Sequence, residues 1–168
     1  MRKIIFISAL LCLAMGASAQ YIGSQYWNIS GGLVIDENQP HGSIGTGKVF
    51  KGYKLGAVLG YRNLNNDQVK ANTVTVGLEF AYYLLHGSRF SLSGLVAASI
   101  GFQRADEKTE LVRLKRHRAF VYGYEVGIRP ELLITPKFAL TAEYRFNMLF
   151  NSVVRNNNYV GLGCIFYL

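Results

Sequence analysis

Hydrophobic and polar residues alternate one by one along most of the chain, a pattern typical of β-strands whose two faces meet different surroundings. The clearest example is residues 71–85, where large apolar residues occupy the even positions from 74 to 84. The same alternation predicts strands at residues 90–103, 119–134, 138–150 and 159–168, and more weakly at 26–35, 43–50 and 53–62. Together these segments make eight strands.

The connections between the predicted strands indicate a meander. Short turns fall at residues 51–52, 86–89 and 135–137, and longer polar connections at 36–42, 63–70, 104–117 and 151–157. Outer-membrane barrels have an even number of antiparallel strands, short periplasmic turns and longer extracellular loops. Strands of about ten residues are long enough to cross a membrane when tilted. The sequence therefore predicts an all-β protein, an eight-stranded antiparallel up-and-down transmembrane β-barrel.

The two faces of the predicted strands differ in kind. One face is apolar and bordered by aromatic residues, as in the interfacial girdles of membrane barrels. The other carries glycines and balanced charges, at Lys54, Arg62, Arg129 and Arg145 against Glu79, Glu125, Glu131 and Glu143. Side chains fill the interior of an eight-stranded barrel, and charges persist there when each has a partner. We predict that these charged residues form a lumen salt-bridge network, a structural plug in preference to a path for protons or ions.

A soluble barrel with a lipocalin-like ligand cavity would show the same alternation with its faces exchanged. Three features favour the membrane form. The charged face holds few charges per strand, the aromatic residues gather on the apolar face, and alternate apolar residues continue to Leu168, as in outer-membrane assembly signals. The predicted partner of the apolar face is therefore outer-membrane lipid.

The first residues point to export. Residues 1–19 begin with Arg2 and Lys3, continue as an apolar run and end in small residues, which predicts a signal peptide cut before Gln20 and a barrel domain over 20–168. Removal of this segment lowers the net charge from +8 to +6 and leaves Cys164 as the one thiol, which can form no disulfide within the chain. Only 17% of residues are charged, against roughly 25% in soluble domains.

No motif indicates a cofactor, a metal or a catalytic centre. Residues 42–48 match the spacing of a phosphate-binding loop, but Val49 stands where Ser or Thr should follow, and no helix pattern comes next. The histidines, His41, His86 and His117, show no ligand spacing. His41 with Ser43, or His117 with a loop serine, could form a rim site like that of lipid A-modifying barrels, although no motif supports either pair.

The most charged segment is the predicted loop that ends at residue 118. Its second half is basic and contains Arg113, Lys115, Arg116 and Arg118. Such a patch suits contact with anionic lipopolysaccharide, a partner protein or DNA, and the alternative is an ordinary solvated loop. No aromatic residues are interleaved with these charges, so we expect no direct sequence-specific binding of nucleic acid.

Several strand segments carry a family resemblance. They are residues 75–85 (TVGLEFAYYLL), 119–123 (AFVYG), 127–131 (GIRPE), 135–140 (TPKFAL) and 159–166 (YVGLGCIF). In this order they resemble the conjugative-transposon protein TraO of Bacteroides-type bacteria. The resemblance implies a non-enzymatic envelope component of DNA transfer, with other envelope or conjugation proteins as partners, and it transfers no catalytic residue.

Three hypotheses follow. The first is a structural or docking component of a conjugation apparatus, with residues 104–117 and 151–157 as its contact loops. The second is a general small outer-membrane protein of the OmpX-like or adhesion kind. The third is a rim-type enzyme that modifies lipid A.

Overall fold

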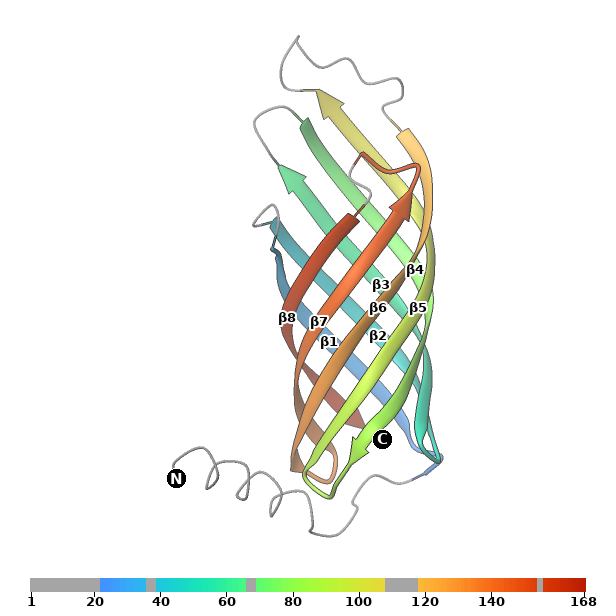
Figure 1. Ribbon diagram of the computed structural model, residues 1–168, viewed down its shortest axis with the longest axis vertical. Helices are drawn as coiled ribbons and strands as arrows, with labels where there is room; N and C mark the ends of the chain where they lie inside the picture. Colours follow the sequence, from blue (N-terminus) through green and yellow to red (C-terminus); the bar gives the residue numbers. More distant parts are fainter. Residues whose placement is uncertain (1–21, 36–38, 66–68, 108–117, 154–155) are drawn as a thin grey trace.

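The computed structural model describes residues 22–35, 39–65, 69–107, 118–153 and 156–168. Within these ranges the chain forms one antiparallel sheet in which each strand pairs with the next and β1 also pairs with β8, so that the sheet closes into a barrel (Figure 1). The strands are β1 (Gln25–Val34), β2 (Gln39–Phe50), β3 (Tyr53–Asn65), β4 (Val69–His86), β5 (Phe90–Glu107), β6 (Arg118–Thr135), β7 (Phe138–Phe150) and β8 (Asn156–Tyr167). The predicted eight-stranded up-and-down barrel is confirmed.

Several strands are longer than the alternation of apolar residues predicted. β4, β5 and β6 each have 18 residues, and β5 continues through Arg104 and Asp106, for which the sequence predicts a loop. β2 likewise starts at Gln39 and β8 at Asn156. The apolar pattern stops where side chains leave the apolar zone, whereas the backbone ladder continues beyond it because its hydrogen bonds do not depend on side-chain polarity.

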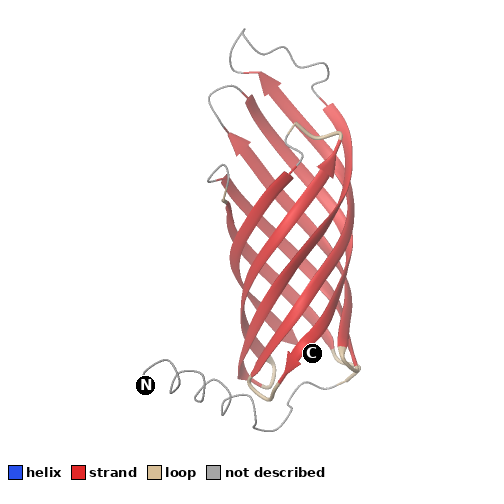
Figure 2. Cartoon of the chain, in the orientation of Figure 1, coloured by secondary structure: helices blue, strands red, loops and turns tan. Residues whose placement is uncertain are grey.

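The two ends of the barrel differ. The short turns at residues 51–52, 87–89 and 136–137 lie at one end, together with the start of β1 and the end of β8 (Figure 1). We call this the turn end, and the opposite end, where the remaining connections lie, the loop end. Strands make up nearly all of the barrel between the two ends (Figure 2). The described residues contain no helix that is long and apolar enough to cross a membrane.

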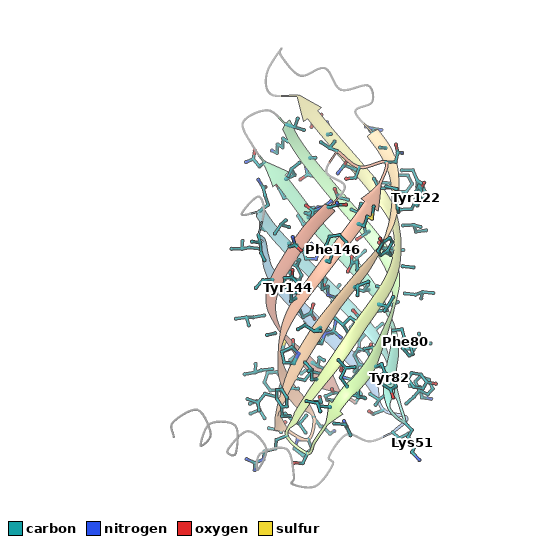
Figure 3. The ribbon with its side chains drawn as sticks, viewed as in Figure 1. Lys51, Phe80, Tyr82, Tyr122, Tyr144 and Phe146 are labelled. Atoms are coloured by element: carbon teal, nitrogen blue, oxygen red, sulfur yellow. The ribbon has the colours of Figure 1, made fainter. Side chains whose placement is uncertain are left out.

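Large apolar side chains cover the outside of the barrel. Leu78, Phe102 and Leu162 expose 68%, 70% and 73% of their surfaces. Phe80 and Tyr82 lie on the outer wall toward the turn end and Tyr122 toward the loop end (Figure 3), so that aromatic residues border the apolar band on both sides. Contiguous exposed apolar surface of this extent is unfavourable in water and is the outer wall of a transmembrane barrel. The alternative with the apolar face inside is not the observed arrangement.

Apolar residues also occupy the interior near both ends. Tyr26, Val49, Ala139, Ile165 and Tyr167 form a buried cluster toward the turn end. A second buried cluster toward the loop end consists of Leu64, Val69, Ala71 and Ala105. Lys54 lies against Tyr26 and Tyr167 of the turn-end cluster, and apart from its partner Glu131 the other charged residues of the lumen lie farther toward the loop end.

Candidate functional site

The buried charges of the lumen form successive layers along the barrel axis. On β6 the inward residues Glu131, Arg129 and Glu125 follow one another from the turn end toward the loop end, and on β7 Glu143 and Arg145 do the same. The period of two places all of these side chains on the inner face.

The layer nearest the turn end is built around Lys54. Its Nζ donates to Glu131 Oε1 and Oε2 at 2.8 and 2.7 Å and to the Tyr167 hydroxyl at 2.7 Å, and that hydroxyl donates to Glu131 at 3.0 Å. The rings of Tyr26, Tyr83 and Tyr167 surround the ammonium, with centroids 5.5, 5.3 and 5.1 Å from Nζ. Lys54 is fully buried, and cation–π contacts gain strength when they are desolvated. We call this group the Lys54 cage.

A glycine makes room for the Lys54 cage. A Cβ at Gly56 would lie 2.6 Å from the Tyr26 hydroxyl and 2.5 Å from the Thr46 carbonyl oxygen. No side chain fits in that space, and a glycine there leaves room for the Tyr26 hydroxyl.

The middle layer is centred on Arg129, whose guanidinium bridges two carboxylates. Its Nη1 and Nη2 donate to the two oxygens of Glu79 at 2.8 and 2.9 Å, and its Nε donates to Glu143 at 2.7 Å. Asn28 of β1 also donates to Glu143, at 3.3 Å. The fork of Arg matches a carboxylate with two parallel hydrogen bonds, so β4, β6 and β7 are joined across the lumen.

Arg145 forms the next layer and shares carboxylates with the middle one. Its guanidinium lies within ion-pair distance of Glu79 (2.7 Å), Glu143 (2.9 Å) and Glu125 (3.1 Å). Asn147 donates to the other oxygen of Glu125 at 2.7 Å. The ion pairs of Arg129 and Arg145 therefore form one continuous network, which we call the arginine network.

A small cavity lies on the loop side of the arginine network. Its lining includes His41, Arg62, Asn157 and Tyr159, and the rings of His41 and Tyr159 are 4.4 Å apart. Arg62 is buried there. Neither polar atom of the buried Asn157 amide has a hydrogen-bond partner within the described protein atoms. A site of this polarity is suited to ordered water, which satisfies otherwise unpaired buried groups.

In this arrangement ion pairs connect the strands across the lumen. Each charge of the Lys54 cage and the arginine network faces an opposite charge at hydrogen-bond distance, which is the condition under which buried ions are tolerated. Among the described residues, no group of three or more His, Cys, Asp and Glu side chains could hold a metal ion. The side chains of this site connect different strands through charge-assisted hydrogen bonds.

The structure brings most of the predicted lumen residues together. Lys54 and Glu131 pair in one layer, and Arg129, Arg145, Glu79, Glu125 and Glu143 pair in the next two. Arg62 lines the loop-end cavity together with Glu125 and Arg145.

Sequence reasoning missed the aromatic part of the lumen. The sequence pattern predicts that aromatic residues gather on the outer, apolar face, yet Tyr26, Tyr83 and Tyr167 point inward around Lys54. The alternation along each strand could have indicated their inward orientation. Tyr83 lies at an odd position of β4, like the inward Glu79, and Tyr26 is the immediate neighbour of the outward Trp27. The inward Asn28 and Asn147 could have been found in the same way.

Three of the residues in the predicted loop contact patch, Arg113, Lys115 and Arg116, lie outside the described residues. Arg118 is the first residue of β6, is exposed, and lies directly opposite Arg104 of β5. The predicted signal peptide and its cut before Gln20 also lie outside the described residues.

The residues considered for catalysis are engaged in other contacts. His41 packs against Tyr159, whereas the Ser43 hydroxyl shares a 2.7 Å hydrogen bond with that of Ser30. His117 lies outside the described residues. The glycine-rich residues 42–48 form part of β2, and among the described residues no helix follows them.

The fold and the apolar outer wall define the class of the protein: a small transmembrane β-barrel with eight strands. The chain matches no protein-family model and no curated protein. Its fold is similar to a major outer membrane protein from Thermus thermophilus, with a TM-score of 0.67 and 9% identity over 88% of this chain and 100% of that one.

Two further solved barrels have the same fold. The N-terminal β-barrel domain of Pseudomonas aeruginosa OprF has a TM-score of 0.58 and 14% identity over 89% of this chain and 100% of that one. The attachment invasion locus protein Ail of Yersinia pestis has a TM-score of 0.56 and 12% identity over 88% of this chain and 100% of that one. At these identities the likeness concerns the fold.

Proposed function

We propose that the protein is a non-enzymatic, non-conducting barrel of the bacterial outer membrane that serves as a structural or docking component of the envelope. The observation that carries the proposal is the filled lumen. The Lys54 cage and the arginine network cross the interior with fully buried ion pairs, while apolar residues cover the outside. A barrel of this kind holds itself in lipid and offers its loop end to other molecules.

The proposal has a direct biophysical test. The purified chain without residues 1–19 should fold into lipid vesicles and migrate differently on gels before and after boiling, as closed barrels do. In planar bilayers it should give no steady ion conductance. A protein that remains soluble without vesicles, or that conducts at a defined level, would contradict the proposal.

We further propose that the envelope role lies in conjugative DNA transfer, as the TraO resemblance of strands β4, β6, β7 and β8 implies. Neighbouring genes for other transfer proteins would support this role. Deletion of the gene from a donor strain should lower mating frequency, and re-expression should restore it. Unchanged mating after deletion would remove the conjugation role and leave the barrel itself intact as a proposal.

The basic loop patch can be tested in the same strain. Replacement of Arg113, Lys115, Arg116 and Arg118 by Gln should lower mating frequency if the patch docks a partner. The matched control replaces four exposed cations at the turn end by Gln, namely Lys48, Lys51, Arg89 and Lys137. Equal mating by both variants would place the docking surface elsewhere.

The alternative role is that of a general small surface barrel of the adhesion kind. The fold likeness to Ail, whose name describes attachment and invasion, favours this candidate. A strain lacking the protein should then adhere less to host cells while mating normally. These two measurements separate the roles, because each predicts a change in only one of them.

A further inference from the structure

Two arginines lie directly opposite each other on the outer wall at the loop end. Arg104 of β5 and Arg118 of β6 are register partners, and both are exposed. Like charges in directly opposed positions of neighbouring strands destabilise a sheet. Opposed side chains have Cβ atoms roughly 5 Å apart, so both guanidinium groups can reach one anion placed between them.

The surroundings of the pair are also cationic overall. Lys70 of β4 is exposed on the same wall, opposite Asp106 of β5. Asp106 lies 3.5 Å from Arg104, and the two side chains expose 52% and 63% of their surfaces. Among the described side chains around the pair, one carboxylate thus stands against three cations, and at this exposure the single ion pair is too weak to neutralise Arg104.

The neighbours on the other side of the pair are aromatic and apolar. The next outward residues on the same two strands, Phe102 and Phe120, are also register partners, and their rings meet edge to face with centroids 5.6 Å apart. Phe120, Tyr122 and Phe150 continue this aromatic surface. Aromatic residues in this position mark the boundary between hydrocarbon and headgroups.

We propose that Arg104 and Arg118, with Lys70 beside them, bind the phosphate group of an acylated glycolipid in the outer leaflet. The aromatic residues place the pair at headgroup level, and the apolar wall below it offers a surface for the acyl chains of the same molecule. Arg suits this role because its planar fork binds phosphate through two parallel hydrogen bonds. The inference rests on the proposed outer-membrane location, with the loop end facing outward.

The test uses the folded barrel in maltoside micelles, which contain no phosphate. Native mass spectrometry would measure retention of lipid A, a bisphosphorylated acylated disaccharide, and of the same lipid after removal of its phosphates. The wild-type barrel should retain the phosphorylated form preferentially. The R104Q/R118Q variant should need about tenfold more lipid for equal retention, as expected for loss of charge-assisted hydrogen bonds. The matched control, K51Q/K137Q, removes two exposed cations at the turn end and should bind like the wild type.

Two further measurements distinguish a lipid phosphate from free phosphate and show whether a variant merely fails to fold. Inorganic phosphate at the lipid concentration should not displace the lipid; if it does, the pair is a free-anion site and the proposal fails. In addition, R118Q should lower the urea midpoint of unfolding only when phosphorylated lipid is present, because without an anion it removes a like-charge repulsion. Equal retention by wild type and R104Q/R118Q, or equal retention of both lipid forms, overturns the inference.

Gel mobility separates this result from failure of the proposed function. A wild-type sample that shows the heat-dependent mobility shift but no phosphate preference refutes the lipid site alone. A sample that never shows the shift refutes the membrane barrel, and the lipid site with it. A preference that survives in R104K/R118K at reduced strength would support recognition by charge and by the Arg fork together.

Discussion

At the scale of single residues, Lys54 shows how one charge is accommodated inside the barrel. An ammonium has three donors, and Glu131 and the Tyr167 hydroxyl accept all of them. The rings of Tyr26, Tyr83 and Tyr167 cover the remaining surface of the charge. Because every donor is used, the removal of either charged partner should cost more than the removal of both.

Lys54→Met should therefore lower the free energy of unfolding by about 3–5 kcal/mol, since it leaves the buried Glu131 without a counter-charge. The double variant K54M/E131Q should lose less stability than either single change, and so much less than their sum. Urea unfolding in vesicles, followed by the fluorescence of the single tryptophan, Trp27, measures both. Strict additivity would show that the two side chains do not depend on each other.

A substitution at Arg129 can separate the contribution of its charge from that of its hydrogen-bond geometry. Arg129→Lys keeps the positive charge but cannot donate to Glu79 through two nitrogens and to Glu143 through a third. We expect a loss of about 1.5–3 kcal/mol, the range for hydrogen bonds to charged groups. The control Arg89→Lys, at an exposed turn position, should stay within about 0.5 kcal/mol of the wild type. An R129K barrel as stable as this control would mean that charge alone holds the layer.

At the scale of the elements, the middle of the seam between β1 and β8 contains a group of small residues. Gly32 and Gly161 are register partners there, and a Cβ on Gly32 would overlap the Val160 carbonyl and lie 2.4 Å from the Gly161 Cα. The obstacle is backbone, which cannot turn aside as the end of a side chain can. Close approach of the two strands at this point therefore requires glycine.

Gly32→Ala should hinder closure of the barrel, with a cost of about 1–3 kcal/mol for overpacking. The fraction of protein with folded gel mobility after refolding should fall. Gly94→Ala is the matched control, because a Cβ there would lie at an ordinary 3.6 Å from the Leu84 side chain. If both variants refold equally well, the seam tolerates a side chain and the close approach is not required.

The strands and their inner and outer faces could be predicted from the sequence. The alternation of apolar and polar residues is visible within each strand and does not depend on the neighbouring strands. It did not allow prediction of which inward charges meet. Lys54 and Glu131 are separated by 77 positions, and their contact depends on the stagger of all the strands between them, which closure of the whole barrel determines. The strand ends were missed because polar residues continue the ladder beyond the apolar band.

At the scale of the whole molecule, two sets of ion pairs cross the lumen in series. The Lys54 cage lies toward the turn end, and the arginine network fills the middle of the barrel. An ion would have to pass both. Removal of one layer should leave the other intact, because the two draw on different carboxylates.

The variant K54M/E131Q should therefore remain non-conducting in planar bilayers, like the wild type, even though its stability is changed. Folded gel mobility in the same preparation confirms that intact barrels are present. Steady conductance steps in this variant would show that the Lys54 cage is the main seal and that the arginine network leaves a path.

The same ion pairs have a consequence for the order of folding. Arg129 and Glu79 are separated by 50 positions, and the Asn28 to Glu143 bond joins positions 115 apart. Contacts between residues so distant in the chain form only after much loop-closure entropy has been lost, so they come late on a folding pathway. Interactions that are absent from the transition state slow unfolding without speeding folding. We therefore expect the charged interior to lower the rate of unfolding and to lengthen the lifetime of the barrel once the strands have closed around it.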